Sequence, residues 1–348
     1  MVKQSIRRNN QAVNFLKGLA CICVIFIHHG FPDSIQRYVI GLARFAVPFF
    51  FMISGFYCFS NNQENDFANC LKKAARMLKL GFYMVLLYGI EHLILECVLE
   101  KQLFKVWIVE RINWKTLLSF LILNDPPFSG MAWYLFAMAY VYFVAAIFSK
   151  YNLNKRITNV IWVLFIVHLV MGNVLTLFCV NVNVHYYMNW ILFGLPCFYL
   201  GVLIKRNIKC FDNIKSDSIL KMAFLFLLLS FFESHVFGNQ ELYIGSLGVS
   251  VFMLIWAMKN LKLRRFKFIQ LLGKKASMYV YIFQSVVFAV IYKILWHTKC
   301  PSREVLWPII GAIVTVIISY MYAVIIDWVK SNMLCSKDRQ SRGGLYDS

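Results

Sequence analysis

The chain has 348 residues, of which 60% are hydrophobic and 15% charged, and its mean hydropathy is +0.63. A soluble globular domain cannot bury so large an apolar fraction, so the composition predicts a polytopic membrane protein. The formal net charge of +20 would suit a nucleic-acid partner. However, the lysines and arginines fall into alternate loops, which is the pattern of membrane topology, and we therefore expect no nucleic acid.

Ten apolar runs are long enough to cross about 30 Å of hydrocarbon, and they predict an all-α fold with about ten transmembrane helices. We expect residues 1–335 to form a single membrane domain. The last residues, 336–348, are too charged and too rich in glycine to pack, and predict a polar cytoplasmic tail. The predicted spans are 13–30, 40–60, 77–98, 131–149, 157–179, 187–204, 219–237, 242–258, 276–296 and 306–329.

Basic residues gather before the first predicted span and after the second, fourth, sixth, eighth and tenth. Such clusters mark the cytoplasmic side, so both termini are predicted to be cytoplasmic. The outer loop 99–130 is long and polar enough to hold an interfacial helix at about 112–123.

The first span carries Lys17 near one end and His28 eleven residues later. At about 100° per residue the two side chains return to nearly the same helix face, roughly 16 Å apart. Ionisable groups within a bilayer are costly, and a pair on one face favours a functional site. The alternative is a snorkelling lysine with a histidine hydrogen-bonded at the far interface.

Further polar residues collect toward the predicted outer half of the bundle. Arg44 lies early in the second span, within a dense apolar segment, and should face the bundle interior, although it could also snorkel. Glu91 lies late in the third span and either pairs with Arg44 or orients a histidine. Trp133 and Tyr134 begin the fourth span, where they suit stacking on a sugar ring or anchoring in the interfacial aromatic belt.

The ten cysteines lie mostly within or at the edges of the predicted spans, which favours small core residues over a disulfide framework. Cys21 and Cys23 are two residues apart and point to different helix faces, so they make a poor metal pair. We expect no metal site.

Several blocks resemble the acyltransferase type 3 family of integral membrane proteins. The first-helix signature of that family is an arginine, ten residues and a histidine, and it reads here as Lys17 to His28. Residues 43–56 end in the Ser-Gly-Phe turn of the family's second helix, and the basic run 72–76 resembles the stretch that follows it. Later family blocks are matched by 131–135, 193–201 and 273–284.

Three positions depart from the family pattern. Lys17 replaces the usual arginine, which keeps the charge but loses the bidentate fork that best grips a phosphate. Asn14 stands where an aspartate is common. Gln284 stands where many members have a histidine, which leaves fewer candidates for a second base.

The resemblance implies an O-acyltransferase in the inner membrane of a bacterium. It would move a short acyl group, acetyl by default, from cytoplasmic acyl-CoA to a hydroxyl of a cell-surface polysaccharide or its lipid-linked precursor. Lys17, Lys72, Lys73 and Arg76 would hold the CoA phosphates at the cytoplasmic face. The pantetheine arm would then carry the thioester toward His28.

Two roles for His28 stay open: general base toward the acceptor hydroxyl, or nucleophile that carries the acyl group. Arg44 is the candidate to stabilise the oxyanion or anchor an acidic acceptor, with Glu91 beside it. The competing hypothesis is a transporter or flippase for a glycan or a polyprenol-linked intermediate. In such a protein the polar residues line a pathway, and the basic clusters only set the topology. A third possibility is a substrate-binding membrane module that resembles this family but serves a different partner.

Overall fold

The computed structural model describes residues 10–28, 31–60, 63–99, 103–128, 130–296, 310–318, 320–322 and 324–325. Throughout these residues every regular element is a helix, which confirms the predicted all-α class. The chain divides into two compact units: a large unit, 33–261, and a terminal unit, 1–32 together with 262–348. A single domain over 1–335 stays a prediction, and the tail 336–348 lies outside the described residues.

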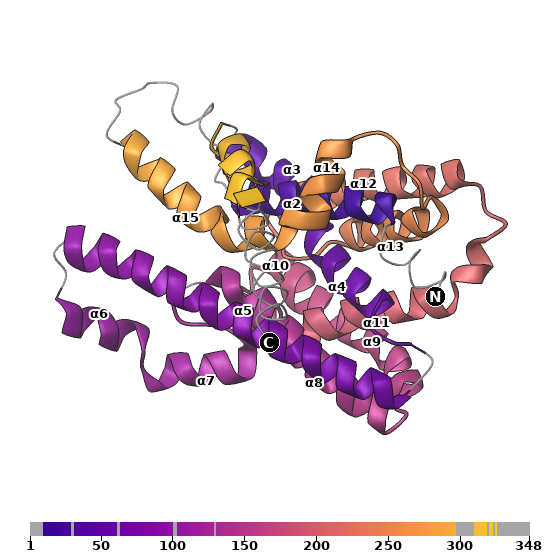
Figure 1. Ribbon diagram of the computed structural model, residues 1–348, viewed down its shortest axis with the longest axis horizontal. Helices are drawn as coiled ribbons and strands as arrows, with labels where there is room; N and C mark the ends of the chain where they lie inside the picture. The colour runs from indigo at the N-terminus through magenta and orange to yellow at the C-terminus, as the bar shows by residue number, and fades with distance from the viewer. Residues whose placement is uncertain are drawn as a thin grey trace, which may run out of the picture. The chain divides into compact units, whose positions relative to one another are not determined.

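The large unit is a bundle whose long helices pack in pairs. Helix α5 lies along α8, α12 lies along α13, and α4 packs against α11 (Figure 1). Its elements are α3 (Asp33–Ala43), α4 (Ala46–Phe56), α5 (Gln63–His92), η1 (Leu93–Leu99), α6 (Phe104–Arg111), α7 (Trp114–Leu123), η2 (Gly130–Ala132), α8 (Trp133–Lys150), α9 (Asn154–Leu169), η3 (Val170–Val174), α10 (Leu175–Leu177), η4 (Val184–Tyr186), η5 (Trp190–Gly194), α11 (Leu195–Arg206), η6 (Ile208–Phe211), α12 (Ser216–Phe237) and α13 (Ile244–Lys259).

The terminal unit joins the first helix to the last part of the chain. Its elements are α2 (Gln11–His28), α14 (Lys267–Leu271), η7 (Leu272–Ala276) and α15 (Ser277–Trp296), with a shorter apolar helix at Ile310–Tyr322. Helix α2 packs against α14, η7 and α15. A core that includes Cys21, Ile25, Leu272 and Val280 holds these segments together.

Five helical segments among the described residues are long and apolar enough to cross a membrane, and about ten spans stays a prediction. They match the predicted spans 13–30, 40–60, 131–149, 157–179 and 219–237. Their bounds are Gln11–His28, Ser34–Phe56, Gly130–Lys150, Asn154–Leu177 and Ser216–Phe237.

Boundaries differ from the predictions where charged residues continue a helix or a polar residue interrupts it. Helix α5 begins at Gln63 rather than at 77, because the Lys- and Arg-containing stretch before the apolar run has high helix propensity. The second span divides into α3 and α4 at Arg44.

The loop 99–130, predicted to be outer, holds the predicted interfacial helix as α7, preceded by α6. The side chain of Asn113 accepts hydrogen bonds from the backbone N–H groups of Lys115 and Thr116, at 3.0 and 3.1 Å, and so caps the first turn of α7. No residue of α7 is buried, and Leu121 and Ile122 are more than half exposed. This exposed apolar surface is consistent with the predicted interfacial position.

Two glycines bring the backbones of α4 and α11 together. A Cβ at Gly55 would lie 1.9 Å from the Phe198 carbonyl oxygen, and a Cβ at Gly201 would lie 1.9 Å from that of Met52. No larger residue fits either position without moving a helix. Phe49, Met52 and Phe198 are fully buried around this crossing and form part of the core of the large unit.

Candidate functional site

Lys17 and His28 lie on one uninterrupted helix, α2, as the sequence predicts. Both side chains are half-buried, and His28 is the last residue of the helix. Eleven helical steps separate them by roughly 16 Å along the axis. The helix therefore has the length needed to connect a group held at Lys17 with a reacting centre at His28.

The backbone around Lys17 lies directly against the chain that follows residue 262. A Cβ at Gly273 would lie 1.9 Å from the Asn14 carbonyl oxygen, and one at Gly18 would lie 2.1 Å from that of Ile269. In addition, the Cys21 thiol donates to the Ser277 carbonyl at 3.5 Å. Two of the blocks that carry the family resemblance, the first-helix signature and 273–284, thus pack against each other.

Arg44 is buried in the large unit and binds the connection between α12 and α13. Its Nη1 and Nη2 atoms contact the two carboxylate oxygens of Glu241 at 2.8 and 3.0 Å, and Nε donates to the Gln240 carbonyl at 2.6 Å. Arg44 is 7% exposed, and its guanidinium faces the protein interior as predicted. Its carboxylate partner is Glu241, so the expectation that Glu91 balances Arg44 is wrong.

Glu91 lies in the last turn of α5, half-buried, and its Oε2 atom is buried without a hydrogen-bond partner in the described part of the chain. The histidine next to it is oriented by a different carboxylate. The Nδ1 atom of His92 lies 2.9 Å from Oε1 of Glu96, which also binds Arg111 at 2.5 Å. A role for Glu91 in the chemistry stays a prediction.

The basic run on α5 presents its cations in two directions. Lys73 is half-buried, donates to the Tyr57 carbonyl at 3.4 Å and lies 5.5 Å above the ring of Tyr142. By contrast, Lys72 and Arg76 are exposed, and their spacing of four residues places them on one helix face. Lys72 and Arg76 therefore present their charge to a ligand more readily than Lys73.

Trp133 and Tyr134 belong to an aromatic cluster at the start of α8. The ring of Phe51 lies 4.9 Å from Tyr134 and 6.2 Å from Trp133, and Phe193 lies 5.8 Å from Trp133. Both predicted sugar-binding residues are half-buried. These contacts give each ring a packing role, and a role in sugar binding stays a prediction.

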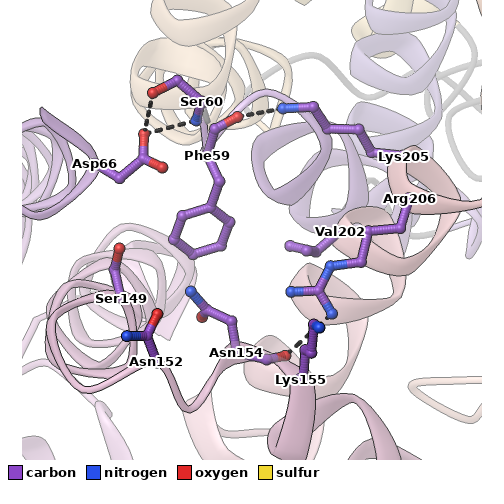
Figure 2. A pocket seen from close by; sticks show the side chains of 10 residues that line it. All are labelled: Phe59, Ser60, Asp66, Ser149, Asn152, Asn154, Lys155, Val202, Lys205 and Arg206. Atoms are coloured by element: carbon purple, nitrogen blue, oxygen red, sulfur yellow. Dashed lines mark hydrogen bonds between the residues drawn. The ribbon is translucent and has the colours of Figure 1, made fainter. Parts of the chain in front are cut away.

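A cavity of about 540 Å³ opens in the large unit, at the opposite end of α4 from Arg44 (Figure 2). We call it the basic pocket. None of the nine predicted site residues lines it. Its two lysines and its arginine fit the positive-inside pattern, so the sequence alone indicates only a topological role for them. The lining residues are Phe59, Ser60, Asp66, Ser149, Asn152, Asn154, Lys155, Val202, Lys205 and Arg206.

Two cysteines are close in the chain to residues of the basic pocket: Cys58 precedes Phe59, and Cys70 follows Asp66 by four residues. The Sγ atoms of Cys58 and Cys70 are 3.1 Å apart, and both residues are buried. The hydrogen bond to Cys70, together with burial, raises the pKa of the Cys58 thiol. Cys197 is also a buried core residue, as predicted, whereas Cys179 is exposed at the end of its helix, where the prediction of a core residue is wrong.

Among the residues whose placement is described, no group of three or more His, Cys, Asp or Glu side chains is arranged to hold a metal ion. In a comparison with known families, the model of the acyltransferase type 3 family, described as "Acyltransferase domain", matches residues 10–324. The chain belongs to this family. Searches of curated proteins and of solved structures find no match.

Membership identifies the chain in general terms as a membrane acyltransferase, and the apolar helices agree with that assignment. It favours an enzyme over the transporter alternative. The matched range contains all nine predicted site residues and the whole basic pocket.

Proposed function

We propose that the protein transfers a short acyl group, acetyl by default, from cytoplasmic acyl-CoA to a hydroxyl of a cell-surface polysaccharide or its lipid-linked precursor. The membrane is the inner membrane of a bacterium. The observation that carries the proposal is the continuous helix α2, which holds Lys17 and His28 eleven residues apart within a chain of the acyltransferase family.

Cationic side chains bind the phosphates of the acyl-CoA donor, and the acyl transfer takes place near His28. Lys17 binds a phosphate of CoA, and the exposed pair Lys72 and Arg76 supplies further cations. Acyl transfer forms a bond between the acceptor oxygen and the carbonyl carbon and breaks the bond between that carbon and sulfur. Acting as a general base, His28 takes the hydroxyl proton and passes it to the departing CoA thiolate.

The direct test is acyl transfer by membranes that contain the wild type or His28→Ala at matched abundance. Radiolabelled acetyl-CoA and a crude surface-glycan fraction are added, and label in the glycan is counted. We expect label with the wild type and a loss of at least about a hundredfold with His28→Ala, the usual size of a general acid–base contribution.

His185→Ala is the matched control, because His185 is a partly exposed histidine in the large unit, 3.6 Å from Asp125. It should keep wild-type transfer. Equal labelling by His28→Ala would remove His28 from the chemistry. Transport of glycan without incorporated label would instead support the transporter alternative.

A second measurement separates the two roles of His28. If His28 is a nucleophile, wild-type protein incubated with labelled acetyl-CoA and no acceptor accumulates protein-bound label, which hydroxylamine releases. If it is a general base, no acyl-enzyme forms. His28→Ala abolishes transfer in both cases.

A further inference from the structure

The basic pocket is built where three connections of the large unit meet. They follow the predicted spans 40–60, 131–149 and 187–204, and the distribution of basic residues assigns all three to the cytoplasmic side. Figure 2 shows Lys205 and Arg206 at the end of α11 and Lys155 at the start of α9. A soluble anion in the cytoplasm can therefore enter this pocket without crossing the membrane.

Positive charge in the pocket exceeds negative charge. Three cations, Lys155, Lys205 and Arg206, share the walls with one carboxylate, Asp66. The Oδ1 atom of that carboxylate accepts hydrogen bonds from the N–H and hydroxyl of Ser60, another lining residue, each at 2.6 Å. Like charges around one cavity repel one another, and a bound anion relieves that repulsion.

Two of these cations, Lys155 and Arg206, have few partners in the described part of the protein. Within the described residues, Lys155 and Arg206 form no ion pair with a carboxylate. Arg206 donates through Nη1 to the Asn154 carbonyl at 3.3 Å, and Lys205 donates to the carbonyl of Phe59. Lys155 and Arg206 are both exposed at the pocket, so a ligand can reach them without unfolding a helix.

Neutral donors complete the lining. The Tyr199 hydroxyl donates to Oδ1 of Asn154 at 2.8 Å, which fixes the side-chain amide and leaves its NH₂ group as a donor. Asn154 also begins α9, a helix of 16 residues whose first-turn N–H groups and dipole favour an anion. A cavity of about 540 Å³ holds more than a single phosphate and suits a group of nucleotide size.

We propose that the basic pocket binds a phosphate ester, namely the nucleotide end of the acyl-CoA donor, with Lys155 and Arg206 as the pocket cations that contact it, in addition to Lys17, Lys72 and Arg76. The identity of the donor rests on the function proposed above. An anionic lipid headgroup carries the same phosphate chemistry, and the experiment below distinguishes the two sources.

The experiment measures binding of radiolabelled CoA to the full-length protein in phosphatidylcholine nanodiscs. We expect Lys155→Gln/Arg206→Gln to raise the Kd about tenfold or more, since two charged contacts to phosphate are lost. The matched control, Lys209→Gln/Lys215→Gln, removes two exposed cations from the connection between α11 and α12, outside the pocket lining, and should leave the Kd unchanged. Unlabelled 3′,5′-ADP should compete with the label, and pantetheine should not.

Nanodiscs of phosphatidylglycerol give the other arm. If the pocket variant keeps wild-type affinity for CoA but retains less phosphatidylglycerol on purification from these nanodiscs than the wild type and the control do, the ligand is a lipid headgroup and the CoA assignment is overturned. If neither CoA nor lipid distinguishes the pocket variant from the control, the phosphate site itself is overturned. CoA binding that depends on Lys155 and Arg206, in a protein that acylates no acceptor, would leave the pocket standing and refute the proposed function.

Discussion

The two ends of helix α4 hold positive charge in opposite ways. At its start, Arg44 is buried and bound through three nitrogens by Glu241 and the Gln240 carbonyl. At its other end, Lys155 and Arg206 of the basic pocket have no carboxylate partner in the described residues and are open to the cavity. The 11 residues of α4 separate these regions by roughly 16 Å.

This difference shows that the partners of a charged residue in an apolar chain indicate whether it stabilises the fold or binds a ligand. A buried cation whose hydrogen bonds end on the protein contributes mainly to the structure, because a ligand would have to displace those bonds. An exposed cation on a cavity that lacks carboxylate partners leaves its charge available to a ligand. Position in the hydropathy profile does not separate these two cases, whereas the partners of the charge do.

The largest effect is expected at Arg44. Arg44→Leu leaves the Glu241 carboxylate without its partner and should lower the free energy of unfolding by about 2 to 3 kcal/mol. This is somewhat less than for a fully buried pair, because the Glu241 side chain is 24% exposed. Thermal unfolding of the purified protein in detergent would measure the loss.

The double variant Arg44→Leu/Glu241→Leu is its control, because it removes both charges and should recover most of the lost stability. Activity of the double variant also tests the predicted role of Arg44 at an oxyanion. A stable and active double variant would exclude that role, and a stable but inactive one would support it. Failure to recover stability would break the assignment of Arg44 to structure.

The second-largest loss of stability is expected in the connection between α12 and α13, which Arg44 binds. The hydroxyl of Tyr243 accepts from the Gln240 N–H at 2.9 Å and donates to the Gly238 carbonyl. Tyr243→Phe removes the partner of the buried Gln240 N–H and of the half-buried Gly238 carbonyl, and should cost about 1 to 2 kcal/mol, again measured by thermal unfolding. A cost below about 0.3 kcal/mol would show that this connection does not need the bond, and would weaken the comparison.

The sequence predicts features that depend on neighbouring residues, and it does not predict contacts between residues that are far apart in the chain. Hydropathy located the helices because the apolar content of a segment is a local property, and α2 and α12 begin within about three residues of their predicted starts. The partner of Arg44 lies 197 residues away in the chain, in a connection that hydropathy describes only as polar. A single sequence therefore suggested the nearer acid, Glu91, which is wrong.

The family blocks have a structural meaning that the sequence alone did not reveal. The Ser-Gly-Phe block and the 193–201 block meet where Gly55 and Gly201 bring α4 and α11 together, and the first-helix block meets 273–284 at Gly18 and Gly273. A large part of the resemblance thus reflects close backbone packing. The basic pocket was missed because its cations lie at helix termini, Lys155 at the start of α9 and Lys205 and Arg206 at the end of α11, where the positive-inside pattern already accounts for them.

A smaller effect is expected from the one carboxylate of the basic pocket. Asp66→Asn keeps an oxygen to accept from the Ser60 N–H and removes a negative charge from the wall. CoA affinity should rise about threefold, since a like-charged neighbour of the phosphate is lost. Binding of labelled CoA at low and high salt would measure the gain, which should shrink as salt screens the charges. An unchanged or weaker affinity at low salt would contradict a binding mode led by charge.

The smallest change in the free energy of unfolding is expected for the pocket cations in the absence of CoA, and it contrasts most clearly with the large change expected for Arg44. Lys155→Gln/Arg206→Gln should change the free energy of unfolding by no more than about 0.5 kcal/mol, because exposed cations without carboxylate partners contribute little to the fold. The same variant should differ from the wild type once CoA is added. A ligand at 100 times its Kd stabilises the state that binds it by about 2.7 kcal/mol, and at that CoA concentration a tenfold weaker variant gains about 1.4 kcal/mol. A large loss without CoA would place these cations, like Arg44, among the residues that hold the fold, and the contrast between the two ends would disappear.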